Sequence, residues 1–493
     1  MTSRLDRITQ QRIDKVQSLR ESGIDPYPKR YPRTHTAVQA VELLEAIEQS
    51  ETKEAKVSVA GRIMANRSMG KSSFMDIRDV TGKIQLLFMN TNQLEEQKLK
   101  VFKDLDIGDF IGVEGNILRT RTGEPTVRVE NFTLLSKSLL PLPDKWHGLV
   151  DVETRYRQRY VDLIANTEVK EMFKIRSRII SAIRQFLDSR DFLEVETPVL
   201  HPSAGGALAA PFITYHNALD REYYLRIALE LHLKRLIVGG FDKVYEIGYV
   251  FRNEGISTTH HPQYTLLETY EAYADYNDVM KMQEELIWEV SHKVLGTDTV
   301  EYAGDTIDLK PPWRRITLRD AVKEYSGIDF VKYPTAAGLM EKMRSQGIEA
   351  DPNKNWAKLV DELLKTCVRP KLIQPTIVYD YPVSMSPLAK NKPGEERVVE
   401  RFQSIIAGLE VDNAYSELND PLLQRERFEE QLRERQESDE ERWTIDEDYL
   451  TALEYGMPPT GGLGIGIDRL VMLLTDKQSI REVILFPQLR EKG

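Results

Sequence analysis

The chain has 493 residues, of which 41% are hydrophobic and 29% charged, and this composition excludes global disorder. A chain of this length has room for about three domains. The single cysteine, Cys367, excludes an intramolecular disulfide and a cysteine-based zinc site. The net charge of −11 argues against a purely electrostatic nucleic-acid binder, although it allows a local basic surface.

The N-terminus lacks the apolar segment of a secretory signal. The longest uncharged run, from Thr197 to Leu219, could cross a bilayer by its length alone. It contains three prolines and two glycines, so we interpret it as loop and buried strand. We therefore expect a soluble, cytoplasmic protein that does not enter a membrane.

Residues 1–50 predict a helical N-terminal extension, with one helix over 1–23 and a second over 37–50 that begins after Thr36. Residues 1–35 carry eight Lys or Arg against four Asp or Glu. An ordinary solvated helix face is one interpretation of this charge. The alternative is a patch that contacts phosphates, which predicts salt-dependent binding.

Residues 51–140 consist of short alternating runs separated by Gly, Asn and Asp, which predict about five strands. That number suits a small closed barrel such as the OB-fold, which often binds single-stranded nucleic acid. The proline-containing segment 141–155 predicts a linker. Residues 156–493 predict a larger region with helix-like segments, which we place at 169–192, 271–300, 334–370 and 421–443.

Residues 245–273 predict a long hairpin around a polar, glycine-containing loop. Residues two apart share a strand face, so one surface would carry Arg252, Glu254, Glu268 and Tyr270. This concentration of charge favours a cleft that binds phosphate or carboxylate, and an exposed face with salt bridges is the alternative. His260 and His261 would point to opposite faces, so we expect no shared metal there.

Two later segments also concentrate polar residues. In 400–420 a strand-like run carries Glu410, Asn413, Tyr415 and Glu417, a set that could hold an ammonium or belong to a capped turn. In 458–476 a glycine-rich strand runs into an amphipathic helix, with Asp468 and Arg469 at the junction. The glycines allow close approach of a flat ligand or of another backbone. The spacing matches neither a P-loop nor a dinucleotide fingerprint.

Together these segments resemble the three signature motifs of class II aminoacyl-tRNA synthetases. Motif 1, near 172–200, ends in FLEVETPVL with Pro198; motif 2, at 245–273, reads FRNEG…HHPQYTLLETY; motif 3, at 458–476, contains GGLGIGIDRL. RYRQRYVDLI, YPVSMSPLAK, NAYSELNDP and the barrel segments GRIMANRSMGKSSF and KIQLLF are similar to the bacterial-type (class IIb) lysyl-tRNA synthetases. The resemblance covers nearly the whole chain in order.

The resemblance implies an α+β fold. An OB-fold anticodon-binding domain at 51–140 would precede an antiparallel-sheet catalytic domain flanked by helices, with a helical insertion near 275–375. It implies a lysine–tRNA ligase that uses ATP and Mg²⁺. L-lysine would attack the ATP α-phosphate to form lysyl-adenylate and pyrophosphate, and the 3′ end of tRNA(Lys) would then take the lysyl group. Motif 1 with Pro198 would form a homodimer interface.

The resemblance also assigns roles to single residues. ATP would be bound by Arg252, Glu254, His260, Tyr264, Glu410 and Arg469. Arg252 and Arg469 would be the catalytic residues. Arg252 would neutralise the lysine carboxylate and the α-phosphate as charge develops, and Arg469 would hold the phosphate tail and stack on the adenine. Lysine would be bound by Gly206 (backbone), Glu230, Arg252, Glu268, Tyr270, Asn413, Tyr415 and Glu417. Glu410 would also hold Mg²⁺. Phe74 and Gln85 would contact anticodon bases, with core packing as the alternative for Phe74.

Several positions depart from the family pattern. The usual residues are Arg, Pro, Glu, Glu and Arg where this chain has Ala210, Leu229, Gln263, Gln403 and Leu409. The usual Glu at position 403 is a second Mg²⁺ ligand, so we expect weaker Mg²⁺ binding or a shifted metal arrangement.

Three alternatives stay open. An aspartate or asparagine enzyme would need a cation for its substrate, whereas three glutamates suit an ammonium. An enzyme that transfers lysine to a protein would lack the barrel. A binding paralogue without turnover is supported by Gln403 alone.

Overall fold

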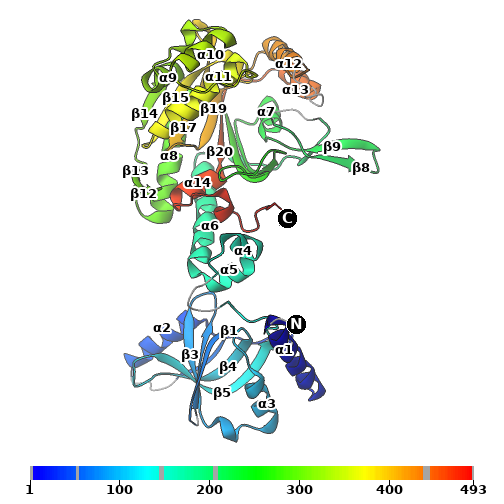
Figure 1. The fold of residues 1–493 in the computed structure, drawn as a ribbon, viewed down its shortest axis with the longest axis vertical. Helices are drawn as coiled ribbons and strands as arrows, with labels where there is room; N and C mark the ends of the chain where they lie inside the picture. Colours follow the sequence, from blue (N-terminus) through cyan, green and yellow to red (C-terminus); the bar gives the residue numbers. More distant parts are fainter. Residues whose placement is uncertain are drawn as a thin grey trace. The chain divides into compact units, whose positions relative to one another are not determined.

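The computed structural model describes residues 4–50, 55–70, 72–143, 149–203, 209–436 and 445–490. The chain divides between Val150 and Asp151 into two compact units, a boundary that lies inside the range predicted as linker. Figure 1 shows the elements of each unit. No helix of the described residues is long and apolar enough to cross a membrane.

The first unit is built around a closed barrel with the strand order β1-β2-β3-β5-β4 (Figure 1). Its strands are β1 (Ala55–Met69), β2 (Ser72–Arg78), β3 (Lys83–Phe88), β4 (Phe110–Arg119) and β5 (Pro125–Ser136). Alternate residues such as Ile63, Met75 and Leu86 fill the interior and are almost fully buried. The predicted five-stranded OB-fold is confirmed.

Three helices accompany the barrel: α1 (Arg4–Glu21), α2 (Ala37–Glu48) and α3 (Glu96–Asp104). The hydroxyl of Thr36 accepts a hydrogen bond from Gln39 N, and the Gln39 side chain accepts one from Thr36 N. This capping box satisfies two backbone donors and explains why α2 begins where the sequence predicts it.

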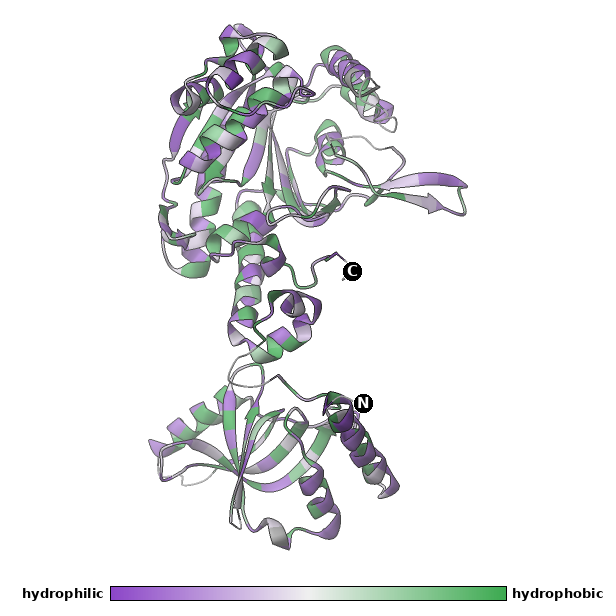
Figure 2. Cartoon of the chain, viewed as in Figure 1, coloured by the Kyte–Doolittle hydropathy of each residue, from purple (hydrophilic) through white to green (hydrophobic). Residues whose placement is uncertain are grey.

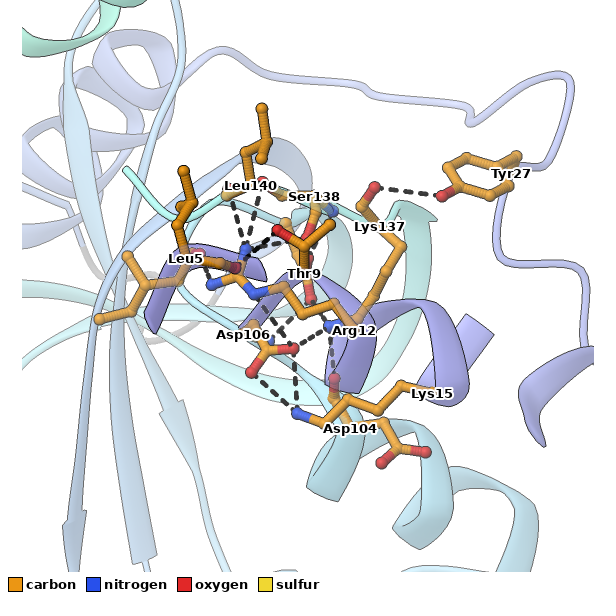
Figure 3. Close-up of polar contacts among 12 residues, drawn as sticks. Leu5, Thr9, Arg12, Lys15, Tyr27, Asp104, Asp106, Lys137, Ser138 and Leu140 are labelled. Atoms are coloured by element: carbon orange, nitrogen blue, oxygen red, sulfur yellow. Dashed lines mark hydrogen bonds and ion pairs between the residues drawn. The ribbon is translucent and has the colours of Figure 1, made fainter. Parts of the chain in front are cut away.

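Helix α1 is tied to the barrel by a polar cluster drawn in Figure 3. Arg12 is 7% exposed, and its guanidinium donates to the carbonyl oxygens of Ser138 (2.8 Å), Leu140 (3.0 Å) and Ile107 (3.0 Å). The solvated-face interpretation of residues 1–35 is therefore wrong for Arg12. Figure 2 shows the rest of α1 as mostly hydrophilic.

The ammonium of Lys137 lies beside this cluster and is enclosed by acceptors (Figure 3). It donates to Asp109 Oδ2 at 2.7 Å and forms an ion pair with Asp106, which also binds Lys15 at 2.8 Å. Burial alone would raise the pKa of Asp106, but the hydrogen bonds from Lys137 and Lys15 outweigh it and lower that pKa. These charges join the helical extension to the barrel.

The second unit contains a large sheet with the order β14-β15-β17-β19-β20-β11-β10-β6, and β16 and β18 also pair with β17. Its strands are β6 (Leu193–Glu194), β10 (Lys243–Phe251), β11 (Gln263–Ala272), β14 (Arg314–Thr317), β15 (Thr376–Pro382), β16 (Asn391–Lys392), β17 (Glu395–Ile406), β18 (Leu409–Glu410), β19 (Asp412–Ser416) and β20 (Thr460–Gly466). Pairing is antiparallel except at the outer pairs β14–β15 and β10–β6. The predicted antiparallel-sheet fold is confirmed.

Helices cover both faces of this sheet (Figure 1). The helices of the described part are α4 (Val152–Arg157), α5 (Arg159–Ala165), α6 (Thr167–Asp188), α7 (Glu230–Val238), α8 (Tyr276–Leu295), α9 (Leu318–Ser326), α10 (Ala336–Ser345), α11 (Trp356–Leu363), α12 (Pro421–Gln436), α13 (Glu447–Glu454), α14 (Ile467–Leu474) and α15 (Ile480–Val483). Helices α6, α8 and α14 pack on one face, whereas α7 and α13 pack on the face that carries Leu266 and Tyr270.

One expectation is corrected here. The run 197–219 contains no buried strand in its described part. Instead, β7 (Leu200–His201) and β8 (Ile213–His216) pair with β9 (Arg221–Leu225), and the Tyr215 side chain is 53% exposed. The helix of motif 3, α14, is amphipathic as predicted, and all of its residues except Arg469 are buried. A separate hairpin is formed by β12 (Thr299–Tyr302) and β13 (Asp305–Asp308).

Lys137→Met removes the cation that faces Asp109, whose side chain is fully buried. The first unit should lose about 3–5 kcal/mol of unfolding free energy, because an unpaired buried carboxylate remains. Hydrogen exchange of the β4 and β5 amides in the full chain measures this loss. Lys56→Met is the matched control, since Lys56 forms an exposed ion pair with Glu130 on the same barrel. Equal amide protection in the two variants would contradict the prediction.

Candidate active site

A cavity of about 630 Å³ lies over β11, β20 and β19, the centre of the large sheet. Strand β20 carries glycine at alternate positions of the face that lines it. Gly462 pairs with Tyr270 on one side and Tyr415 on the other, and Gly464 pairs with Glu268 and Asn413. The cavity therefore has a floor without side chains and polar groups along both edges, a form suited to an elongated ligand.

Gly462 shows why one of these glycines is required. A Cβ at this position would overlap Glu417 Oε1 and would lie 2.7 Å from Tyr270 Cε1. The sequence left open whether the glycines admit a flat ligand or another backbone. At Gly462 the neighbour is instead a carboxylate, whose approach needs a residue without a side chain.

One end of the cavity is acidic. Glu230 begins α7 and Glu417 follows β19, and these side chains meet at the ammonium of Lys234, which lies 2.5 Å from each carboxylate. Lys234 is fully buried and Glu417 is 1% exposed. Burial alone would lower the pKa of Lys234, but its attraction to Glu230 and Glu417 raises it well above the usual value, so the ammonium stays charged.

Glu268 is the third carboxylate at this end and is 6% exposed. It accepts hydrogen bonds from Tyr270 Oη (3.2 Å) and from the backbone N–H of Leu229 (3.3 Å), but no ion pair joins it to a cation in the described residues. Burial, followed by repulsion from Glu230, raises the pKa of Glu268 to about 8. Glu268 is thus the buried carboxyl group at this end that has no cationic partner within the described residues.

Asn413 and Tyr415 lie on the edge opposite Glu268 and Tyr270, and both line the cavity as their alternation predicts. The Asn413 amide contacts Tyr415 Oη, and its carbonyl oxygen accepts a hydrogen bond from Arg401 Nε at 2.8 Å. Arg401 also lines the cavity. Sequence reasoning missed Arg401, although its place in an alternating strand one residue before Phe402 was a usable signal.

The other end of the cavity is basic. Arg252 lies 5.5 Å above the Tyr264 ring, and Arg469 Nη2 lies 3.3 Å from His260 Nε2. Burial, then repulsion from Arg469, lowers the pKa of His260, which favours the neutral imidazole. Along β11 the order Tyr270, Glu268, Leu266, Tyr264 leads from the acidic to the basic end.

The predicted strand positions of Arg252 and Glu254 are wrong. Strand β10 ends at Phe251, so both residues lie in the motif 2 loop, where Arg252 N donates to Pro262 O at 2.8 Å. Both still line the cavity. His260 and His261 have different partners: His260 Nε2 lies beside Arg469, whereas His261 is buried and its Nε2 accepts a hydrogen bond from Gln488 N at 2.8 Å.

The carboxylate predicted to bind Mg²⁺, Glu410, forms an ion pair with Arg369, and both line the cavity. Gln403 is buried, and its carbonyl oxygen accepts a hydrogen bond from Tyr381 Oη at 2.9 Å. No cluster of three or more His, Cys, Asp or Glu in the described ranges could enclose a metal ion. The residues fit a Mg²⁺ ion held by one protein carboxylate and otherwise by ligand oxygens.

Gly206 lies outside the described residues. Phe74 and Gln85 are half-buried on the outer face of the barrel, since their strand neighbours Met75 and Leu86 fill the interior. Core packing is therefore not the role of Phe74. Pro198 is exposed.

Comparisons with known proteins agree with this geometry. Residues 151–490 match the family model of class II tRNA synthetases (D, K and N), and residues 57–135 match that of the OB-fold nucleic acid binding domain. The chain is 58% identical over 484 residues to a lysine–tRNA ligase of Dehalococcoides mccartyi, covering 98% of this chain and 97% of that protein. It is 54% identical to the lysine–tRNA ligase of Moorella thermoacetica, with 98% and 97% covered. For that of Nostoc sp. the identity is 52%, with 98% and 87% covered.

The chain belongs to the lysine–tRNA ligase family of class II tRNA synthetases. One departure from the family pattern has a visible consequence. Where the family usually has Pro, Leu229 supplies the N–H that binds Glu268, a donor that proline lacks. The structure offers no explanation for Ala210, Gln263 or Leu409.

Gly462→Ala should destabilise the second unit by about 1–3 kcal/mol, because the added methyl group would force Glu417 and Tyr270 to move in a packed interior. Gly464→Ala is the matched control on the same strand. Its Cβ would meet its nearest neighbours at 3.7 Å, an ordinary contact. Thermal unfolding of the full chain compares the variants, and equal unfolding temperatures would refute this account of Gly462.

Proposed function

We propose that the chain activates L-lysine with ATP and transfers the lysyl group to tRNA(Lys). The observation that carries this proposal is Glu268, a buried carboxylate of the cavity that no cation of the described residues neutralises. A buried unpaired carboxylate is costly, and the ε-ammonium of lysine would remove that cost. An uncharged amino acid would leave it unpaired, so the site discriminates against such rivals.

The two ends of the cavity suit the two parts of the reaction. At the acidic end, Glu268, Tyr270 and Glu417 would hold the ε-ammonium, and Glu230 the α-ammonium. At the basic end, Arg252 would hold the lysine carboxylate against the ATP α-phosphate and offset the charge that develops as oxygen attacks phosphorus. Catalysis would then rest on orientation and charge stabilisation, without a protein nucleophile.

The basic end also provides groups for ATP. Tyr264 would stack on the adenine, Glu254 would accept a hydrogen bond from its amino group, and Arg469 with neutral His260 would bind the phosphates. Glu410 would hold Mg²⁺, which supplies charge neutralisation of the phosphates when bound. The support for this assignment is that all five side chains line the same cavity.

The barrel would bind the anticodon. Phe74 and Gln85 lie on its outer face, where an aromatic ring can stack on a base and an amide can read one. Lys29, Arg30 and Arg33 are exposed and could contact phosphates. Arg12 and Lys15 cannot, because they hold α1 to the barrel.

We also propose a homodimer in the cytoplasm, where translation uses charged tRNA. In the segment 193–200, which contains the exposed Pro198, three large apolar side chains are 40–48% exposed, namely Leu193, Val199 and Leu200. A cluster of large exposed apolar residues is typical of an interaction surface.

Amino-acid-dependent ATP–pyrophosphate exchange over the twenty amino acids tests the function. Exchange with lysine alone, followed by lysylation of tRNA(Lys), is the expected result. Exchange with aspartate or asparagine would overturn the substrate assignment. No exchange at any Mg²⁺ concentration would favour a binding paralogue.

The value of kcat/KM for lysine in this assay should rise about tenfold per pH unit below pH 8 and level off above it, because protonated Glu268, with a pKa of about 8, cannot pair with an ammonium. Glu268→Gln should remove this dependence together with most of the activity. Glu271→Gln is the control, since Glu271 belongs to the same strand and pairs with Lys243 at 2.8 Å. A flat profile between pH 6 and 8 in the unaltered enzyme would exclude this role of Glu268.

Gln403→Glu restores the carboxylate that is usual in the family. We expect the Mg²⁺ concentration for half-maximal exchange, at fixed ATP, to fall several-fold because a second hard ligand is added. Gln403→Leu controls for the lost hydrogen bond from Tyr381 and should not lower the Mg²⁺ requirement. An unchanged Mg²⁺ dependence in Gln403→Glu would reject the idea that position 403 limits metal binding.

A further inference from the structure

Lys234 is the one cation of the described residues that lies among the three buried glutamates of the cavity. It is the fifth residue of α7, one helical turn after Glu230, and its side chain is fully enclosed. The charged and titratable groups that face it come from every neighbouring element: Glu230 on α7, Glu417 after β19, Tyr270 on β11 and Tyr449 on α13.

The charges of this end can be matched one by one. Glu230, Glu268 and Glu417 supply three negative charges when ionised, and Lys234 supplies one positive charge. An enclosed region of low dielectric strongly disfavours a net charge. A ligand that brings two ammonium groups restores neutrality, and lysine carries an α- and an ε-ammonium. A ligand with one ammonium leaves an excess carboxylate, and it must take up a proton instead.

We propose that Lys234 is a positioning and specificity-determining residue for lysine. Three glutamates can pair with three ammonium groups, and the Lys234 side chain supplies one of these. The substrate can therefore supply two. Its ion pairs hold the side chains of Glu230 and Glu417 in place before lysine arrives. This inference rests on the proposed function, because it concerns how the same cavity selects its amino acid.

A purely structural ion pair between α7 and the segment after β19 is the competing account. The two accounts differ in what the loss of the ammonium does to lysine binding. A structural tie would affect folding or kcat at every pH. An ammonium that balances charge would affect the KM for lysine most, and would do so through the protonation of the carboxylates.

Lys234→Met removes the charge while keeping most of the length of the side chain. In lysine-dependent ATP–pyrophosphate exchange, we expect KM for lysine at pH 7 to rise at least about tenfold with little change in KM for ATP. The pH below which kcat/KM for lysine falls, its acid limb, should rise by about one unit or more. The variant should therefore recover part of its activity at pH 9. Lys392→Met is the matched control, because Lys392 also lies between two carboxylates, Asp380 (2.6 Å) and Glu395 (2.9 Å), but does not line the cavity.

A KM for lysine within about twofold of the unaltered enzyme, or a lowered kcat with the acid limb unmoved, would overturn the proposal. Titration calorimetry on the unaltered enzyme tests it without a variant that has to fold. Lysine binding at pH 7 should release protons from Glu268 and Glu417, because burial raises the pKa of both to about 8, and no release would overturn the charge balance on which the role of Lys234 rests. An unaltered enzyme that neither binds nor activates lysine would instead overturn the proposed function itself.

Discussion

The burial of three carboxylates at one end of a single cavity is the constraint on which the site depends. Glu230, Glu268 and Glu417 are 9%, 6% and 1% exposed, and buried charges of one sign are stable only with compensating partners. The chain compensates in two ways. Lys234 pairs with two of the carboxylates, and Glu268 receives hydrogen bonds from Tyr270 and a backbone N–H. On the proposed function, the remaining imbalance would make the cavity selective for a cationic ligand.

The sheet topology determines how an elongated ligand can lie in this cavity. Strand β20 lies between β11 and β19, and its glycines leave a channel that runs along the strands. Acidic groups gather beside Gly462, and Arg469 follows the end of β20 at the other extremity. A lysine molecule that lies along this channel has its side-chain ammonium and its carboxylate fixed relative to the phosphates. Orientation of this kind can supply a large part of the rate enhancement of a two-substrate reaction.

Much of this site could be predicted from alternation along strands, and the failures share one cause. The shared face of Asn413 and Tyr415 follows from the two-residue period, which is local. Arg252 and Glu254 were misplaced because the period does not show that β10 ends at Phe251. Lys234 and Arg12 escaped prediction because a charged residue on a helix is usually solvated. Their burial depends on segments far away in the chain, which no local pattern reveals.

The region of Gln403 and Glu410, where Mg²⁺ is proposed to bind, differs in charge from the family pattern. The family usually places carboxylates at both positions 403 and 410, whereas here the first is an amide bound to Tyr381 and the second is paired with Arg369. One negative charge is lost, and a guanidinium lies beside the carboxylate that remains. Arginine is well suited to phosphate oxygens, because its planar donors can bind two of them at once. If ATP binds as proposed, part of the neutralisation of its phosphates would therefore fall to Arg369, a fixed protein cation that needs no ion from solution.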